Sequence, residues 1–143
     1  MTTKVEIPVH KDINQIIELI NSDKKHLIPR NRKEISKKIH FWRVIKERGK
    51  VVACGCFDAY SKRMAEIRSF IVHPDYRGRG YAKKLLDELI KFTRPNQQVF
   101  VVTSIPDFFQ KNKFDSCMGE KFIMFYKNTD QADTYTPLDF KSA

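Results

Sequence analysis

One segment of the chain, residues 65–90, constrains the fold more than any other. Its sequence, AEIRSFIVHPDYRGRGYAKKLLDELI, begins with an apolar run typical of a strand and continues through a loop with two glycines. Apolar residues at helical spacing then indicate an amphipathic helix that ends before Pro95 (Ala82, Leu85, Leu86, Leu89 and Ile90). Because residues 98–103 form another short apolar run, this helix is predicted to cross over between two strands of one sheet.

The rest of the chain shows strand and helix patterns on both sides of this segment. Asp12 is predicted to cap a first helix, in a capping box with Gln15. Arg48 and Gly49 form a short hairpin connection between two strands. The order of elements predicts a mixed α/β sheet whose early strands are antiparallel. Strands are predicted at 5–9, 41–47, 50–60, 65–72, 98–103, 114–118 and 121–127, and further helices at 12–22, at 31–40 and from Pro106.

Length and composition exclude several classes of protein. With 143 residues, the chain is predicted to fold as a single domain over 1–128, followed by a polar tail at 129–143. No apolar run approaches the roughly 18 residues that cross a bilayer, and the first twelve residues lack the apolar segment of a signal peptide. Cys54, Cys56 and Cys117 lack a zinc-type spacing and are predicted to be reduced and mostly buried. We therefore expect a cytoplasmic protein without a metal site or a membrane partner.

The formal net charge of +10 is concentrated in one stretch of the sequence. Residues 24–50 contain eleven basic and two acidic side chains, whereas the remainder of the chain is nearly neutral. Such a stretch favours a polyanionic or carboxylate-bearing partner, through an attraction that salt weakens. It is equally compatible with a solvated basic face that keeps the protein soluble.

The two-glycine loop has the composition of an anion-binding site. The first amides of a helix lack partners inside the helix and have a partial positive charge, and both properties favour a phosphate. Gly78 and Gly80 allow backbone amides to approach such a group without a Cβ in the way. Glycine is also common in ordinary turns between a strand and a helix, so the loop alone does not establish a ligand. Cationic side chains add formal charge nearby (Arg77, Arg79, Lys83 and Lys84).

The whole string resembles the acetyl-coenzyme A signature of the GNAT superfamily of N-acetyltransferases. The core of that signature, Gln/Arg-x-x-Gly-x-Gly/Ala, corresponds to Arg77, Gly80 and Ala82, and the usual Val-His-Pro-x-Tyr precedes it at 72–76. The resemblance covers residues 5–127 and implies the GNAT fold, an α/β (α+β) arrangement. In that fold a mixed, mostly antiparallel sheet contains a splayed pair of parallel strands and has helices on both faces. The resemblance also implies acetyl-CoA (coenzyme A) as the cosubstrate.

The resemblance further assigns cofactor-binding residues along this segment. The free edge of the strand, at Phe70, Ile71 and Val72, would pair with the pantetheine arm, and the gap toward 98–103 would admit the thioester. The Val72 amide would stabilise the oxyanion that forms when an amine attacks the thioester. Backbone amides of the loop and of the start of the helix would hold the pyrophosphate (Arg77, Gly78, Arg79, Gly80, Tyr81 and Ala82).

Glu66 is the predicted catalytic base, because an amine acceptor must lose a proton before it attacks. Several family members, including histone acetyltransferases and N-acetylglutamate synthases, place a carboxylate at this point of the strand. An exposed carboxylate paired with Arg68 is the alternative interpretation. The usual general acid is missing, since Phe109 stands where many members have a tyrosine. The thiolate then leaves unaided or takes a proton from another side chain (Thr103, Ser104 or Tyr126).

A weaker resemblance in the basic stretch concerns the acceptor. Residues 27–34, LIPRNRKE, are similar to the Leu-x-x-Arg-Ser-Arg-Glu stretch of bacterial N-acetylglutamate synthases, and the Phe-Phe-Gln-Lys run at 108–111 is similar to theirs. It implies that Arg30 binds a substrate carboxylate, for which a guanidinium fork is suited. Otherwise Arg30 and Arg32 are exposed charges on a loop. No counterpart of the arginine-rich C-terminal strand of those enzymes is found, so glutamate, another amino acid, a polyamine and a peptide or protein all stay open as acceptors.

The leading prediction is an acetyl-CoA-dependent N-acetyltransferase that acts on a primary amine by direct transfer, with an amino acid or another carboxylate-bearing small molecule as one candidate acceptor. One alternative is a nucleic-acid or ribosome-associated binding module that uses the basic stretch and the Arg-Gly-Arg-Gly loop. The basic stretch is not regularly interleaved with aromatic residues, which argues against nucleic acid as a partner. A catalytically silent CoA-binding protein is the other alternative. Dimers are common in the resembling family, and a homodimer is left open.

Overall fold

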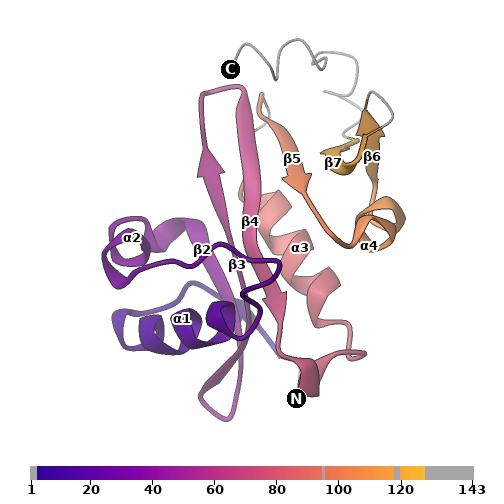
Figure 1. Cartoon of the computed structure of the whole chain (residues 1–143). Helices are drawn as coiled ribbons and strands as arrows, with labels where there is room; N and C mark the ends of the chain where they lie inside the picture. The colour runs from indigo at the N-terminus through magenta and orange to yellow at the C-terminus, as the bar shows by residue number, and fades with distance from the viewer. Residues whose placement is uncertain (1–2, 95, 118–119, 128–143) are drawn as a thin grey trace. The chain divides into compact units, whose positions relative to one another are not determined.

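The computed structural model describes residues 3–94, 96–117 and 120–127 (Figure 1). The strands are β1 (Val5–Glu6), β2 (Trp42–Glu47), β3 (Lys50–Ala59), β4 (Met64–Val72), β5 (Gln98–Val102), β6 (Phe114–Cys117) and β7 (Glu120–Tyr126). The helices are α1 (Ile13–Asn21), α2 (Arg32–Lys37), α3 (Tyr81–Lys91) and α4 (Pro106–Lys111), with 3-10 turns η1 (His10–Asp12), η2 (Ile39–Phe41) and η3 (Pro74–Tyr76).

The described strands form one mixed sheet in the order β1-β2-β3-β4-β5-β7-β6. The pairs β1–β2, β2–β3, β5–β7 and β6–β7 are antiparallel, whereas β4 and β5 are parallel. This arrangement confirms the predicted sheet, and α3 is the predicted crossover helix between β4 and β5. The register of the parallel pair runs from Met64↔Gln98 to Ile67↔Val101, so β4 continues to Val72 beyond its register with β5.

The chain forms two compact units, and the first combines residues 1–56 with 69–91. On one face of its strands, α1 and α2 share a hydrophobic core with residues of β2 and β3 such as Trp42 and Cys54. Side chains alternate between the two faces of a strand, so Gly55 lies on the opposite face from Cys54. There Gly55 lies against α3, because a Cβ added to it would be 3.0 Å from Leu89 Cδ1 and 3.6 Å from Leu85 Cδ2. Helices therefore cover both faces of this part of the sheet, as predicted.

The second unit combines residues 57–68 with the chain from 92 onward. In it β5 lies between β4 and β7 and is buried along most of its length, which confirms the prediction of an interior strand. Aromatic side chains form its core. The Phe100 ring lies 6.0 Å from that of Phe125, and Phe109 of α4 packs edge-on at 5.2 Å against Phe114. Phe109, where a tyrosine was expected by resemblance, is thus a buried packing residue.

The N-terminal elements differ from the prediction in where the first strand ends and in how the first helix begins. The strand predicted at 5–9 ends at Glu6, before Pro8, which has no amide hydrogen to donate to a sheet. The predicted capping box is wrong: Asp12 accepts from the Val9 amide at 2.9 Å and pairs with Lys46 Nζ at 2.8 Å, and its side chain caps nothing in α1. Gln15 accepts from the Val51 amide at 2.7 Å instead of closing the box. The helix predicted at 12–22 accordingly begins one residue later, at Ile13.

Other boundaries also shift. The helix predicted at 31–40 divides into α2 and η2, and Asn31 caps α2 by accepting from the Glu34 amide at 2.9 Å. The loop at 73–80 contains the short turn η3. Cys54 and Cys56 are buried free thiols, as predicted, whereas the Cys117 side chain and the tail predicted at 129–143 lie outside the described residues. Within the described ranges, no helix is long and apolar enough to cross a membrane.

Candidate functional site

The loop between β4 and α3 has a backbone that favours glycine at two positions. Gly78 and Gly80 both have a φ of +81°, in the left-handed region. A Cβ placed on either residue would meet no atom within 4 Å, so the space beside this backbone is open. The Lys84 amide donates to the Gly80 carbonyl oxygen at 3.2 Å. The amides of residues 81–83, at the first turn of α3, therefore have no partner inside the helix.

Side chains of the loop hold it in place. The Arg77 Nε donates to the Val72 carbonyl oxygen at 3.0 Å, which ties the loop to the end of β4. Arg79 pairs with Glu47 at 3.0 Å, and its guanidinium lies 4.8 Å from the centre of the Tyr76 ring. His73 accepts from the Asp75 amide at 3.1 Å and acts in the loop's own hydrogen bonding. The structure thus brings the predicted residues 77–82 together in one turn whose amides and positive helix end suit an anion.

The last three residues of β4 follow an irregularity at Ser69. This residue has a φ of +52°, a conformation that costs a residue other than glycine about 1–3 kcal/mol. Cys54 Sγ donates to the Ser69 carbonyl oxygen at 3.4 Å, and Arg30 Nε donates to Ser69 Oγ at 3.1 Å. Burial raises the pKa of the Cys54 thiol, which keeps it protonated as a donor. The strand edge at 70–72 therefore follows directly after a residue, Ser69, that hydrogen bonds from Cys54 and Arg30 hold in position.

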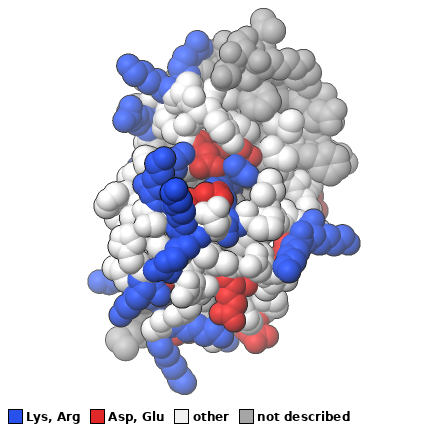
Figure 2. Space-filling model, turned by 60° about the vertical axis from the view of Figure 1, so that its left-hand side comes forward, with Lys and Arg blue, Asp and Glu red and all other residues white. Residues whose placement is uncertain are grey.

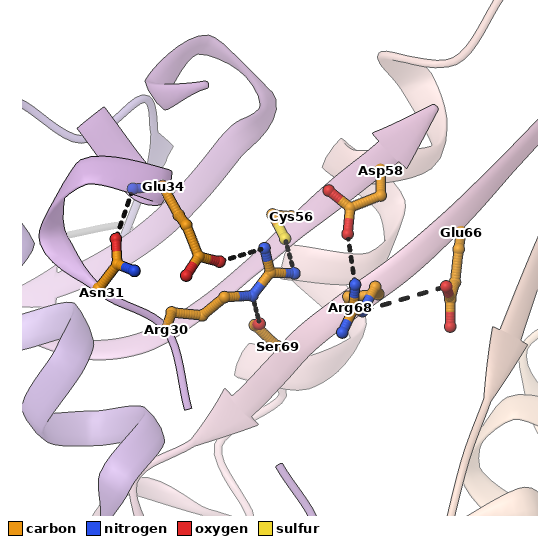
Figure 3. A network of polar contacts seen from close by, with 8 residues as sticks. All are labelled: Arg30, Asn31, Glu34, Cys56, Asp58, Glu66, Arg68 and Ser69. Carbon is orange, nitrogen blue, oxygen red and sulfur yellow. Dashed lines mark hydrogen bonds and ion pairs between the residues drawn. The ribbon is translucent and has the colours of Figure 1, made fainter. Parts of the chain in front are cut away.

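Arg30 lies in the loop before α2, and its side chain is only 9% exposed (Figure 3). Besides the bond to Ser69, its Nη2 lies 3.6 Å from Cys56 Sγ and its Nη1 lies 3.8 Å from a carboxylate oxygen of Glu34. The guanidinium also lies 5.6 Å from the centre of the Trp42 ring. Arg30 is therefore not an exposed charge on a loop: the fold holds it by several contacts. The one anionic neighbour among those contacts, Glu34, has a half-exposed side chain.

Glu66 belongs to a polar network of the second unit (Figure 3). Its carboxylate accepts a short hydrogen bond from the Tyr60 hydroxyl, and the Arg68 Nε lies 4.0 Å from it. Arg68 in turn donates to Asp58 at 3.0 Å. Burial and then the hydrogen bond to Glu66 raise the pKa of Tyr60 to about 12, so the phenol stays protonated at neutral pH. The predicted pairing of Glu66 with Arg68 is present, and the Tyr60 hydroxyl lies closer to the carboxylate than Arg68 does.

Sequence reasoning missed Asp58, Tyr60 and Ser69. A signal for the first two existed, because the strands predicted at 50–60 and 65–72 follow each other closely, and pairing them as a hairpin places even-numbered positions of both strands on one face. Asp58, Tyr60, Glu66 and Arg68 satisfy this rule. Ser69 carried no such signal, since a left-handed residue within an apolar strand is not marked by its type.

The basic stretch at 24–50 is largely solvated. On the face drawn in Figure 2, Lys and Arg side chains form a band beside a smaller acidic group. Within the described residues, six lysines of this stretch are exposed and make no ion pair. Their positive charges attract anions over a distance, but this attraction does not select one kind of anion over another. These six lysines are Lys24, Lys25, Lys33, Lys37, Lys38 and Lys50.

Residues 13–110 match the family model described as "Acetyltransferase (GNAT) family". The chain belongs to the GNAT acetyltransferase family. The matched range includes the loop at 77–80, the network around Glu66 and the loop that holds Arg30, so each of these three groups of residues lies within the GNAT segment. The resemblance inferred from residues 72–82 is confirmed.

Curated GNAT relatives are bacterial proteins named amino-acid acetyltransferase. The chain is 31% identical over 98 residues to one from Vibrio atlanticus, covering 65% of this chain and 22% of the relative. It is 28% identical over 105 residues to one from Pasteurella multocida, covering 70% of this chain and 24% of the relative. The chain thus spans about a quarter of the length of the curated relatives it matches.

Solved structures support the GNAT fold. A Mycobacterium tuberculosis protein in complex with CoA has a TM-score of 0.77 at 24% identity, covering 97% of this chain and 80% of that one. The N-acetylglutamate synthase of Neisseria gonorrhoeae, complexed with coenzyme A and N-acetyl-glutamate, has a TM-score of 0.74 at 21% identity. That match covers 80% of this chain and 28% of the synthase. At these identities the likeness concerns the fold alone.

Proposed function

We propose that this chain transfers an acetyl group from acetyl-CoA to a primary amine. The observation that supports this most directly is the loop at 77–80, inside the segment that the family model matches. Its two glycines have open space beside a left-handed backbone, and the unpaired amides of α3 follow directly. This open space would let a diphosphate approach the backbone amides directly.

The residues of this region fit the parts of CoA. The amides of residues 77–82 would hold the pyrophosphate, because no Cβ blocks Gly78 or Gly80. The edge of β4 at Phe70, Ile71 and Val72 would hydrogen-bond the pantetheine amides, in the manner of a strand pairing with a neighbour. Bound acetyl-CoA would supply the acetyl thioester. Two similar structures were solved with coenzyme A, which supports this assignment.

Glu66 is the residue that we assign as general base. A primary amine is mostly protonated at pH 7, so a carboxylate that accepts its proton makes the nitrogen nucleophilic. The Glu66 side chain is 13% exposed, and Tyr60 and Arg68 hold it in one position. The Val72 amide is the proposed donor toward the thioester oxygen, where negative charge develops.

The acceptor that we propose is an amine with a carboxylate group, such as an amino acid. The curated relatives are named amino-acid acetyltransferases, and the Neisseria structure contains N-acetyl-glutamate. Arg30 would bind the carboxylate, which would replace that of Glu34 at 3.8 Å from the guanidinium. The half-exposed Glu34 would be displaced at a small cost, because exposed ion pairs contribute about 1 kcal/mol or less.

Calorimetry with CoA tests the cofactor site. Gly80→Ala places a methyl group in the open space of the loop, and we expect CoA to bind at least about tenfold more weakly. Gly49→Ala is a matched control, because Gly49 has a φ of +77° and equally open space in the β2–β3 hairpin. Both substitutions add the same kind of backbone strain, so they should cost similar stability.

Equal CoA affinity in these two variants, or no CoA binding by the unmodified chain, would overturn the proposed function. A short RNA titrated in the same experiment distinguishes the binding-module alternative, which requires tight RNA binding without CoA binding. A panel of amines assayed by thiol release then identifies the acceptor. We expect amines with a carboxylate to be preferred, and Arg30→Lys to raise the KM for them, because lysine lacks the planar fork.

A further inference from the structure

The hydroxyl of Tyr60 has a role that the family signature does not assign. Tyr60 follows the end of β3, and the residue is 52% exposed. The hydroxyl nevertheless donates a short hydrogen bond to Glu66, six positions further along the chain. The bond joins the two strands of one hairpin, within the second unit.

The backbone and the ring of Tyr60 are both held in place. Its amide donates to the Met64 carbonyl oxygen at 3.0 Å, which closes the turn between β3 and β4. Inside the turn, Ser61 Oγ accepts from the amides of Arg63 and Met64, each at 3.1 Å. The ring stacks on Phe100 of β5 with 6.1 Å between the centroids. Because the backbone and the ring of Tyr60 are both held, its hydroxyl has little freedom to move, and it lies within hydrogen-bond distance of the Glu66 carboxylate.

We propose that Tyr60 is a positioning residue for Glu66, which fixes the orientation of the carboxylate and keeps it ionised so that it can accept the proton of the amine. This inference rests on the proposed function, in which Glu66 is the general base. The hydrogen bond stabilises the charged form of the carboxylate more than the neutral form. A carboxylate has about four acceptor sites, so one hydrogen bond does not use up its capacity to take a proton.

Among the described residues, the charged and titratable groups that contact Glu66, directly or through Arg68, include Tyr60, Arg68 and Asp58. Arg68, 4.0 Å away, favours the ionised carboxylate, and Asp58 offsets part of that effect because it pairs with Arg68 at 3.0 Å. On β5 the residue in register with Glu66 is Phe100, which does not titrate. With a pKa raised to about 12, Tyr60 stays a donor through the whole range in which Glu66 titrates.

Removal of the hydroxyl by Tyr60→Phe tests the proposal. The ring on Phe100 is retained, so the change is confined to the hydrogen bond. We expect the acidic limb of the kcat/KM profile to move upward by about 0.5–1 pH unit, because the carboxylate is harder to ionise without its donor. The carboxyl carbon of Glu66, titrated by NMR in the chain without CoA, should show an upward shift of the same size.

Two comparisons separate positioning from a general effect on the fold. Tyr76→Phe makes the same change in η3, where the phenol makes no hydrogen bond among the described residues, and should leave the NMR midpoint of Glu66 unchanged. In a Glu66→Gln background, Tyr60→Phe should have no further effect on kcat/KM, since the carboxylate that it positions is absent.

An unshifted NMR midpoint of Glu66 in Tyr60→Phe would overturn the proposal. It would also be overturned if Tyr60→Phe lowered kcat/KM by the same factor in the wild-type and Glu66→Gln backgrounds. A shifted NMR midpoint in a chain that lacks acetyl transfer would overturn the proposed function and, with it, the catalytic meaning of Tyr60. A shift in both measurements supports the two together. The NMR titration requires no turnover, so the two failures are distinguishable.

Discussion

Arg30→Ala tests whether Arg30 contributes to the stability of the fold or serves solely to bind a substrate. The Arg30 side chain is 9% exposed, and its loss removes a charge-assisted hydrogen bond to Ser69 and a longer contact with Cys56. A hydrogen bond to a charged group contributes about 1.5–3 kcal/mol. The contact with the Trp42 ring adds about 0.5–1 kcal/mol, and the half-exposed pair with Glu34 adds less than about 1 kcal/mol.

These contributions share one side chain, so they do not add in full. We expect Arg30→Ala to lower the free energy of unfolding by about 2–3 kcal/mol, which corresponds to roughly 5–10 °C in Tm for a chain of this length. Urea denaturation followed by circular dichroism measures it. Arg32→Ala is a matched control, because Arg32 follows in the same segment, is exposed and hydrogen-bonds Asn14 at 2.9 Å. It should change the stability by less than about 0.5 kcal/mol.

A loss below about 0.5 kcal/mol in Arg30→Ala would refute this reasoning, because it would mean that the contacts contribute nothing net to the folded state. An arginine kept solely for a ligand is expected to behave in that way, or even to stabilise the chain when it is removed. The expected destabilisation would instead show that Arg30 supports the strained Ser69 whether or not an acceptor binds there.

Three other predictions concern the base, the acceptor and the core. Glu66→Gln should lower kcat/KM by about 10²–10⁴-fold at neutral pH and leave CoA affinity nearly unchanged. Initial rates measure the first effect and calorimetry measures the second. Wild-type turnover across pH 6–9 would rule out Glu66 as the general base. Glu34→Gln should lower the KM for amines with a carboxylate relative to amines without one, because it releases the Arg30 guanidinium; an unchanged KM ratio would argue against the acceptor assignment. Gly55→Ala should cost about 1–2 kcal/mol of stability in urea denaturation, since its Cβ would lie 3.0 Å from Leu89 and 3.1 Å from Phe70. Unchanged stability would mean that those side-chain ends move aside freely.

The elements that sequence patterns predicted well are those in which the spacing of apolar residues and the flanking turn residues indicate the same boundaries. The apolar spacing predicts a helix that begins after Gly80 and ends before Pro95, and α3 spans Tyr81–Lys91. The spacing is clear because one face of this helix packs against the sheet. The Arg48–Gly49 connection is a tight hairpin in which both residues have positive φ, at 52° and 77°. The loop at 77–82 was also predictable, since its glycines follow a strand and precede a helix.

The parts that were not predictable depend on contacts between residues distant in the sequence. Asp12 has the residue type of a helix cap, but its buried carboxylate pairs with Lys46, which lies 34 positions further along the chain. The positions of Arg30 and Ser69 likewise depend on each other across 39 positions. Short windows of sequence contain neither partner. The Tyr60 network falls between these cases, because the hairpin rule predicts its shared face but not which hydroxyl meets which carboxylate.

The two compact units are interleaved along the chain, since residues 57–68 belong with the part from 92 onward. A truncation after Lys91 would therefore leave residues 64–67 without the parallel partner strand that they have in the complete chain. Strand edges without partners invite pairing with other chains, so such a fragment should self-associate. During synthesis from the N-terminus, the same edge stays open until residues 98–101 have been made. Efforts to divide this chain into separately expressed halves should fail for that reason.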